Sequence, residues 1–144
     1  MASTHVAHDC FIGDNVILSN LATLGGHVQI GNWAILGGGV LVHQFTQIGE
    51  HSLIGGGFRA VQDVPPFIIA ANYPLEYKGV NIVGLKRRGF SKEDIDLIKK
   101  AYRGFFRSGG NRKTAIEKIE SEFPKTKVIQ KILDFIKHSN RGII

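Results

Sequence analysis

The first half of the chain repeats one six-residue pattern, and residues 6 to 60 read VAHDCFIGDNVILSNLATLGGHVQIGNWAILGGGVLVHQFTQIGEHSLIGGGFRA. Every sixth residue from Val6 to Ala60 is aliphatic, and the phase never slips. Glycine often follows the aliphatic residue directly, and a mostly small or β-branched side chain stands four residues after it. A hexad of this kind is typical of a parallel β-helix, in which each repeat makes one short strand and one corner.

Three such hexads make one triangular coil of about 18 residues, and stacked coils lie about 4.8 Å apart. The aliphatic side chains are expected to fill the interior, while the small ones let each wall lie close to the axis. We expect the glycines, such as Gly25 and Gly37, to serve tight corners, because a positive φ costs little without a Cβ. The aliphatic hexad resembles that of the hexapeptide transferases, which implies a left-handed parallel β-helix.

The repeat ends at residues 63–66, Asp-Val-Pro-Pro, because paired prolines donate no hydrogen bonds to a ladder. We therefore predict a β-solenoid plus α-helices, with the β-helix over residues 1–66 and a small C-terminal helical domain over 67–144. An irregular or extended link is expected over residues 67–77. Helices are expected over 81–88, 91–107, 114–123 and 126–138, the second of them starting at a capping box on Ser91 and stopping at residues 108–111.

Composition bears on the compartment of the protein and on the kinds of partner it can bind. The single cysteine, Cys10, allows no disulfide framework and suits a reducing compartment. No apolar run is long enough to span a membrane and no signal peptide is evident, so we expect a cytoplasmic protein without stable membrane insertion. The net charge of +6 suits an acidic small substrate or an acidic partner protein as well as nucleic acid.

Polar residues converge on one corner when positions are counted along the 18-residue coil. The group occupies outward corner positions in three adjacent columns and comprises His8, Asp9, Gly26, His27, His43 and Gln44. His5 lies on the adjoining wall. An imidazole takes a proton from a hydroxyl and returns it to a leaving group near neutral pH. We predict His8 as the general base, Asp9 as its orienting partner and the Gly26 N–H as an oxyanion donor.

Other interpretations of this corner remain open. His5 and His8 form an H-x-x-H pair, which raises the alternative of a zinc-dependent β-helix enzyme of the carbonic anhydrase type. The pair has no evident third ligand, so we predict neither a metal nor any other cofactor. A purely architectural β-helix without chemistry is a further alternative. Cys10 occupies an inward position, where packing is its expected role, so direct attack by an acceptor hydroxyl is the simpler mechanism.

Several blocks resemble the UDP-N-acetylglucosamine O-acyltransferase family, which begins lipid A synthesis in Gram-negative bacteria. They are His5-Val6-Ala7-His8-Asp9-Cys10, Gly25-Gly26-His27-Val28, Val42-His43-Gln44-Phe45, Gln62-Asp63-Val64-Pro65-Pro66, Gly79-Val80-Asn81 and Gly84-Leu85-Lys86-Arg87-Arg88-Gly89-Phe90. The resemblance runs from His5 to the C-terminus. It implies transfer of a 3-hydroxyacyl chain from acyl carrier protein to the 3-hydroxyl of UDP-N-acetylglucosamine by a homotrimer, with no nucleic acid as partner.

The resemblance also implies roles for individual residues. His8 matches the catalytic base, Asp9 its partner and Gly26 the oxyanion amide. Positions that match the substrate cleft are His5, His27, His43 and Gln44, and positions that match nucleotide or phosphate contacts are Asn81, Arg87 and Arg88. Gly56 matches the end of the acyl pocket. The family carries many more coils before the His5 block, so the alternative is a catalytically incomplete fragment that acts only as a trimeric β-helix module.

Overall fold

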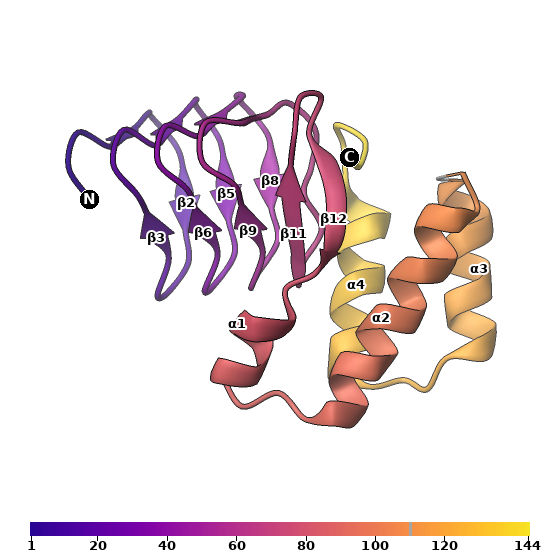
Figure 1. The fold of residues 1–144 in the computed structure, drawn as a ribbon. Helices are drawn as coiled ribbons and strands as arrows, with labels where there is room; N and C mark the ends of the chain where they lie inside the picture. Colours follow the sequence, from indigo (N-terminus) through magenta and orange to yellow (C-terminus); the bar gives the residue numbers. More distant parts are fainter. Residues whose placement is uncertain (110) are drawn as a thin grey trace. The chain divides into compact units, whose positions relative to one another are not determined.

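A computed structural model describes residues 1–109 and 111–144 (Figure 1). They form two compact units. The first comprises Met1–Asn81 with Ser139–Ile144, and the second comprises Ile82–His138. The first unit is a β-solenoid of hexapeptide repeats and the second is helical, so the predicted fold class is confirmed. The left hand of the solenoid stays an inference from the family.

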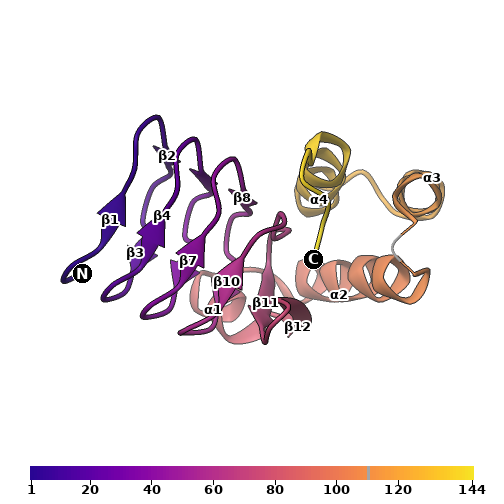
Figure 2. The same ribbon diagram turned by 90° about the horizontal axis from the view of Figure 1, so that it is seen from above.

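Three walls of short strands form the solenoid. Figure 2 shows its successive coils lying side by side. Wall A holds β1 (His5–Val6), β4 (Thr23–Leu24), β7 (Leu41–Val42) and β10 (Arg59–Ala60). Wall B holds β2 (Phe11–Ile12), β5 (Gln29–Ile30) and β8 (Gln47–Ile48). Wall C holds β3 (Ile17–Leu18), β6 (Ile35–Leu36), β9 (Leu53–Ile54), β11 (Ile68–Ala71) and β12 (Glu76–Val80). Parallel pairing joins His5 to Thr23 and Thr23 to Leu41, so one coil takes 18 residues.

The interior of the solenoid is filled as the hexad predicts. From the second coil onward the aliphatic positions are at most 3% exposed, and they are Leu24, Ile30, Leu36, Val42, Ile48, Ile54 and Ala60. Full burial of one such Leu or Ile side chain stabilises the fold by about 1.5–3 kcal/mol. Val6 occupies the same position in the first coil and is 44% exposed, because no earlier coil covers it among the described residues.

The corners do not use glycine as the sequence suggested. Positive φ recurs at every sixth residue from Ser3 to Gly57, three places after the aliphatic position, and most of these residues are not glycine. Gly25 has no positive φ; a Cβ added there would stand 2.7 Å from the backbone N of Gln44 in the next coil. The expectation of a positive φ at Gly25 was therefore wrong. Gly25 lacks a side chain because the next coil passes too close.

The solenoid continues beyond the paired prolines. Ile69 of β11 pairs in parallel with Leu53, so the last coil is two residues shorter than the others. β12 then pairs antiparallel with β11. The segment 67–77, expected as an irregular or extended link, is largely extended and forms strand β11 and the start of β12. The first compact unit comprises Met1–Asn81 together with Ser139–Ile144, and the division into a β-helix over 1–66 and a helical domain over 67–144 stays a prediction.

The last six residues close the end of wall B. Val64 bridges Ile48 in parallel, and Ile143 adds a further parallel bridge to Asp63. The Asp63 side chain is fully buried. Its carboxylate accepts hydrogen bonds from the Gln47 N–H at 2.8 Å and the Ser139 hydroxyl at 2.5 Å. One buried carboxylate thus joins the third coil to the C-terminal tail.

Four helices make up the second unit: α1 (Ile82–Arg87), α2 (Lys92–Arg107), α3 (Arg112–Glu122) and α4 (Lys127–His138). All four lie where the sequence predicts helices. Ser91 caps α2, because its hydroxyl accepts from the Asp94 N–H at 3.1 Å. The predicted stop of this helix at residues 108–111 includes Gly110, which lies outside the described residues. Among the helices that the structure describes, none has the length and apolarity that crossing a membrane requires.

We expect replacement of Asp63 by alanine to lower the free energy of unfolding by about 2–4 kcal/mol, since each buried donor left unpaired costs about 1–3 kcal/mol. Glu76→Ala is the matched control, because exposed Glu76 makes only an ion pair of 3.1 Å with Lys78 and should cost less than about 1 kcal/mol. Urea denaturation measures both. Equal losses would show that the Asp63 cluster does not hold the tail.

Candidate active site

The candidate site lies at the corner between walls A and B, where two-residue turns stack coil upon coil. His8-Asp9, Gly26-His27 and Gln44-Phe45 are these turns. The His27 N–H donates to the His8 carbonyl and the Phe45 N–H donates to the Gly26 carbonyl, both at 3.0 Å. The second residue of each turn has a positive φ between 58° and 65°. Because the corners share one backbone geometry, their side chains leave the solenoid in register.

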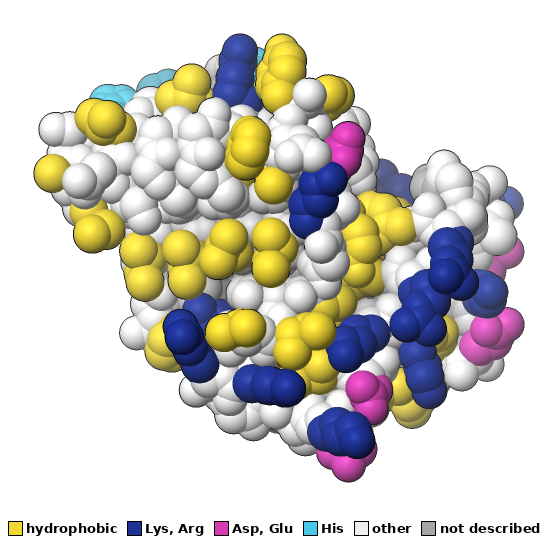
Figure 3. All heavy atoms as spheres, viewed as in Figure 1, with side chains coloured by type: hydrophobic (Ala, Val, Ile, Leu, Met, Phe, Trp, Pro, Cys, Tyr) yellow, Lys and Arg dark blue, Asp and Glu magenta, His cyan; other side chains and the backbone are white. Residues whose placement is uncertain are grey.

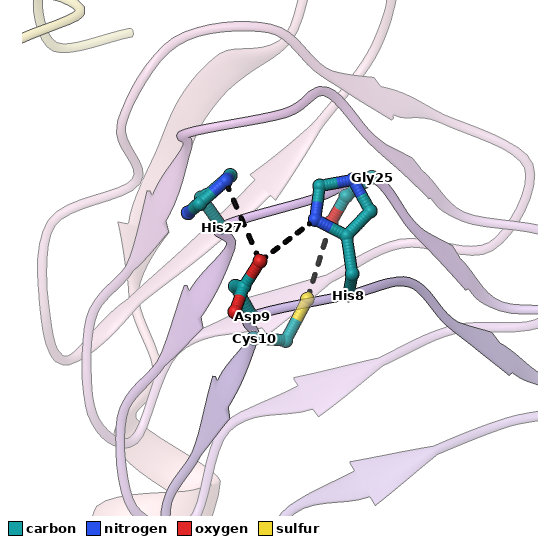
Figure 4. Close-up of polar contacts among 5 residues, drawn as sticks. All are labelled: His8, Asp9, Cys10, Gly25 and His27. Atoms are coloured by element: carbon teal, nitrogen blue, oxygen red, sulfur yellow. Dashed lines mark hydrogen bonds and ion pairs between the residues drawn. The ribbon is translucent and has the colours of Figure 1, made fainter.

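This register brings three predicted site residues together, as Figure 4 shows. His8 Nδ1 lies 3.0 Å from Asp9 Oδ2, and His27 Nε2 lies 3.7 Å from the same oxygen. The two imidazole rings meet edge to face, with their centroids 5.2 Å apart. All three side chains are exposed. The predicted pairing of His8 with Asp9 is present, and the carboxylate also attracts His27.

The state of Asp9 determines which nitrogen of His8 is available. The hydrogen bond from His8 and then the charge of His27 lower the pKa of Asp9 below its usual 3.8. Asp9 is therefore ionised at neutral pH and can only accept a hydrogen bond. Nδ1 of neutral His8 must carry the proton and donate it, which leaves the lone pair on Nε2. A lone pair on an exposed ring nitrogen is what a general base needs.

Gly26 supplies the space in which that nitrogen lies. A Cβ added to Gly26 would stand 2.6 Å from His8 Cε1 and 2.7 Å from His8 Nε2. The His8 ring therefore rests directly against the Gly26 backbone, and Gly26 is buried although it lies at an outer corner. Among the described residues, the Gly26 N–H donates no hydrogen bond. Any side chain at this position would push the ring away.

Phe45 stands in the same column as Asp9 and His27, although no role was expected for it from the sequence. Its ring stacks on His27 with centroids 4.7 Å apart and an interplanar angle of 9°. Phe45 is bulky for a residue with a positive φ, a combination that is uncommon. The stack covers one face of the His27 ring, whose Nε2 lies 3.7 Å from Asp9 Oδ2. The column position was the available signal, but it does not show which way a ring is turned.

The remaining predicted cleft residues surround this corner without joining the cluster. His5 is exposed on β1 of wall A. His43 and Gln44 follow β7 and are exposed, and His43 Nδ1 lies 3.2 Å from the Gln44 carbonyl oxygen. Gly56 lies at the corner between walls C and A, where an added Cβ would stand 3.2 Å from the Gly38 carbonyl. Within one chain, Gly56 and His8 thus occupy opposite edges of wall A.

The predicted nucleotide contacts lie elsewhere. Asn81 is buried, and its side-chain amide donates at 3.0 Å to the backbone carbonyl of His51, at the corner between walls B and C. Arg87 ends α1 and Arg88 follows it, both in the second unit. Burial, and next the charge of Arg87, lower the pKa of Arg88. The Asn81 side chain is thus held inside the solenoid. Arg87 and Arg88, by contrast, are two adjacent cations at the end of a short helix.

Two models of known protein families match parts of the chain. A family model described as Udp N-acetylglucosamine O-acyltransferase, domain 2, matches residues 63–144, which is more than half of the chain. The chain belongs to this O-acyltransferase family. A second model, described as bacterial transferase hexapeptide (six repeats), matches residues 9–44. The second match covers the coils that carry His27 and Gln44.

Relatives within the O-acyltransferase family match over the whole chain. An acyl-[acyl-carrier-protein]–UDP-N-acetylglucosamine O-acyltransferase from Aliivibrio salmonicida is 46% identical over 99% of this chain and 54% of its own length. Its counterpart from Thiobacillus denitrificans is 44% identical over 100% of this chain and 56% of its own length. The chain therefore spans about half the length of the curated relatives that it matches.

Solved structures of the family agree with the fold. A UDP-N-acetylglucosamine acyltransferase from Bacteroides fragilis superposes with a TM-score of 0.96 at 46% identity, covering 99% of this chain and 56% of that one. A UDP-N-acetylglucosamine acyltransferase from Francisella novicida gives a TM-score of 0.95 at 38% identity, covering 100% and 53%. The resemblance found in the sequence is thereby confirmed at the level of the family.

We expect Gly26→Ala to displace the His8 ring, because the new Cβ would overlap it. The hydrogen bond from His8 is the largest cause of the lowered pKa of Asp9, so that pKa should rise toward 3.8 in the variant. Gly38→Ala is the control, since Gly38 holds the same turn position but a Cβ there meets only the Asn20 carbonyl at 3.5 Å. Carbon-13 NMR of the Asp9 carboxyl measures the pKa. An unchanged pKa in Gly26→Ala would contradict the contact.

Proposed function

We propose that this chain carries the catalytic corner of an enzyme that transfers a 3-hydroxyacyl chain from acyl carrier protein to the 3-hydroxyl of UDP-N-acetylglucosamine, the first step of lipid A synthesis. The observation that carries the proposal is the placement of His8, with Nδ1 on Asp9 and Nε2 against the bare backbone of Gly26. The relatives named above as acyl-carrier-protein-dependent O-acyltransferases support the choice of reaction.

In the proposed mechanism His8 Nε2 takes the proton from the sugar hydroxyl as its oxygen attacks the thioester carbonyl carbon. The tetrahedral intermediate then collapses, the carbon–sulfur bond breaks, and the thiol of the carrier receives the proton from Nε2. The transient imidazolium is stabilised by the Asp9 carboxylate at 3.0 Å. The Gly26 N–H is the proposed donor to the oxyanion, because it makes no hydrogen bond within the described part of the chain.

No covalent enzyme intermediate is needed. The Cys10 thiol donates to the Gly25 carbonyl at 3.2 Å and is only partly exposed, so it is a poor candidate for a nucleophile. Its contact agrees with a packing role. A positioned general base contributes about 10²–10⁴-fold to a rate, and His8 is the residue to which the proposal assigns that factor.

Further substrate contacts are proposed both at this corner and at residues away from it. His5, His27, His43 and Gln44 are proposed to line the cleft, and all four are exposed on its side of the solenoid. Arg87 and Arg88 are proposed to bind the diphosphate, since paired guanidinium groups suit phosphate oxygens. Asn81 is proposed to act through its backbone region, because its side chain is engaged with His51. Gly56 is proposed to end the acyl pocket.

The apolar outer face of wall C supports assembly as a homotrimer. Its outward positions on β3, β6, β9 and β11 are all aliphatic: Ile17, Ile35, Leu53 and Ile69. Figure 3 shows hydrophobic side chains gathered in a row along this face. Outward positions of walls A and B include His5, Thr23, Gln29 and Gln47 instead. A continuous apolar row is typical of a contact surface.

The net charge of +6 supports the proposed partner, because a basic surface suits an acidic carrier protein.

The direct test is acyl transfer by a chimera that takes from the Aliivibrio salmonicida relative the segment that the match leaves out. With 3-hydroxyacyl carrier protein and UDP-N-acetylglucosamine, the chimera should form the acylated sugar nucleotide. His8→Ala should lower the turnover number about 10²–10⁴-fold. Mass spectrometry of the product measures both.

Arg59→Ala serves as a control, because Arg59 is exposed on β10 and belongs to none of the proposed contacts. Full turnover in His8→Ala would remove the proposed mechanism. A folded trimeric chimera without product would instead favour the non-catalytic β-helix module. His5 lies outside the group formed by His8, Asp9 and His27, so the H-x-x-H pair itself does not support the carbonic anhydrase alternative.

A further inference from the structure

The cluster at the catalytic corner has a donor set that suits a metal ion as well as a proton. Among the described residues, His8, Asp9 and His27 form the one group of three histidine, cysteine or acidic side chains whose ligand atoms all lie within 4.8 Å of one another. Two imidazole nitrogens and one carboxylate oxygen are ligands that zinc prefers. We propose that this corner binds one Zn²⁺ ion, which acts as a reversible blocker of His8 and not as a cofactor.

Two of the three ligand–ligand distances are close to those of a zinc site, and the third pair, on His8 and His27, lies within 4.8 Å, so rotation of the side chains can bring all three atoms to one ion. Ligand atoms about 2.0–2.1 Å from a tetrahedral zinc stand about 3.4 Å from each other. The separations of Asp9 Oδ2 from His8 Nδ1 and from His27 Nε2 are 3.0 and 3.7 Å, on either side of that value. The His8 and His27 side chains are 72% and 44% exposed, so both rings have room to turn toward a shared ion.

The solenoid preorganises two of the three ligands on adjacent coils. Asp9 and His27 occupy equivalent positive-φ positions one coil apart, tied by the hydrogen bond from the His27 N–H to the His8 carbonyl. Phe45 supports the far face of the His27 ring. The outer side of the cluster is open to solvent, which leaves a fourth coordination position for water. Such an open position is usual where zinc is held by three protein ligands.

Zinc at this site would prevent His8 from acting as a base, because it would fix the tautomer of the imidazole. The ion would bind Nδ1 of His8, the nitrogen that faces Asp9. A neutral imidazole metallated on one nitrogen keeps its proton on the other. Nε2 would then donate instead of accepting, and could not take the proton of a hydroxyl. This consequence rests on the proposed function of His8, whereas the binding of zinc does not.

Equilibrium dialysis of the 144-residue chain against ZnCl₂ tests the binding. We expect one ion per wild-type chain and an affinity at least about tenfold weaker in each of Asp9→Asn, His27→Gln and His8→Gln, because loss of even a supporting partner of a metal ligand costs about 10–100-fold. Circular dichroism of each variant shows whether it is folded as the wild type is.

Two variants separate this site from other ligands on the chain. His43→Gln removes an exposed imidazole that follows the next strand of wall A, and Cys10→Ser removes the neighbouring thiol; both should bind zinc as the wild type does. Unchanged affinity in the three ligand variants would overturn the proposal, as would loss of zinc in His43→Gln or Cys10→Ser. Zinc binding without inhibition of acyl transfer by the chimera would preserve the site and remove its effect on the base.

Discussion

The hydrogen bond from the His27 N–H to the His8 carbonyl, 3.0 Å long, joins one corner of the solenoid to the next. The same bond recurs one coil further on, from the Phe45 N–H to the Gly26 carbonyl. Because such bonds set both the spacing and the rotation of successive corners, the side chains of equivalent positions leave the solenoid in columns. The candidate base and its carboxylate partner are neighbours in one turn, whereas the bare Gly26 comes from the next coil, and this ladder places the glycine against the base.

The ladder has a conformational cost that the residues at the corners help to offset. A side chain at a positive φ costs roughly 1–2 kcal/mol, less for Asn, Asp and His. Asp9, Asn15, His27 and His51 belong to the tolerant types, and Gly39 and Gly57 avoid the cost. Phe45 has no such tolerance, but its stack on His27 recovers contact area. The chemistry of this corner therefore uses residue types that the fold itself tolerates there.

Much of this arrangement was predictable from the sequence because the hexad is strictly periodic. Counting by 18 was enough to bring His8, Asp9 and His27 to one corner. The reason why glycine occupies position 25 was not predictable. A side chain there would collide with the next coil, and the local sequence pattern does not show how close that coil passes. The hairpin after the prolines and the return of the tail to Asp63 are tertiary pairings that the hexad does not report, and the contact of Asn81 with His51 follows the hairpin. The family identity, by contrast, lay in short blocks of sequence.

The proposed chemistry of this corner requires that Asp9 hold the Nδ1 proton of His8, which leaves Nε2 free to act as a base. Long-range proton–nitrogen NMR spectra of the nitrogen-15-labelled protein, recorded above about pH 8 where an unperturbed imidazole is neutral, report which nitrogen of each histidine carries the proton. His8 should show a protonated Nδ1 and an unprotonated Nε2. A protonated Nε2 with a bare Nδ1 would contradict it.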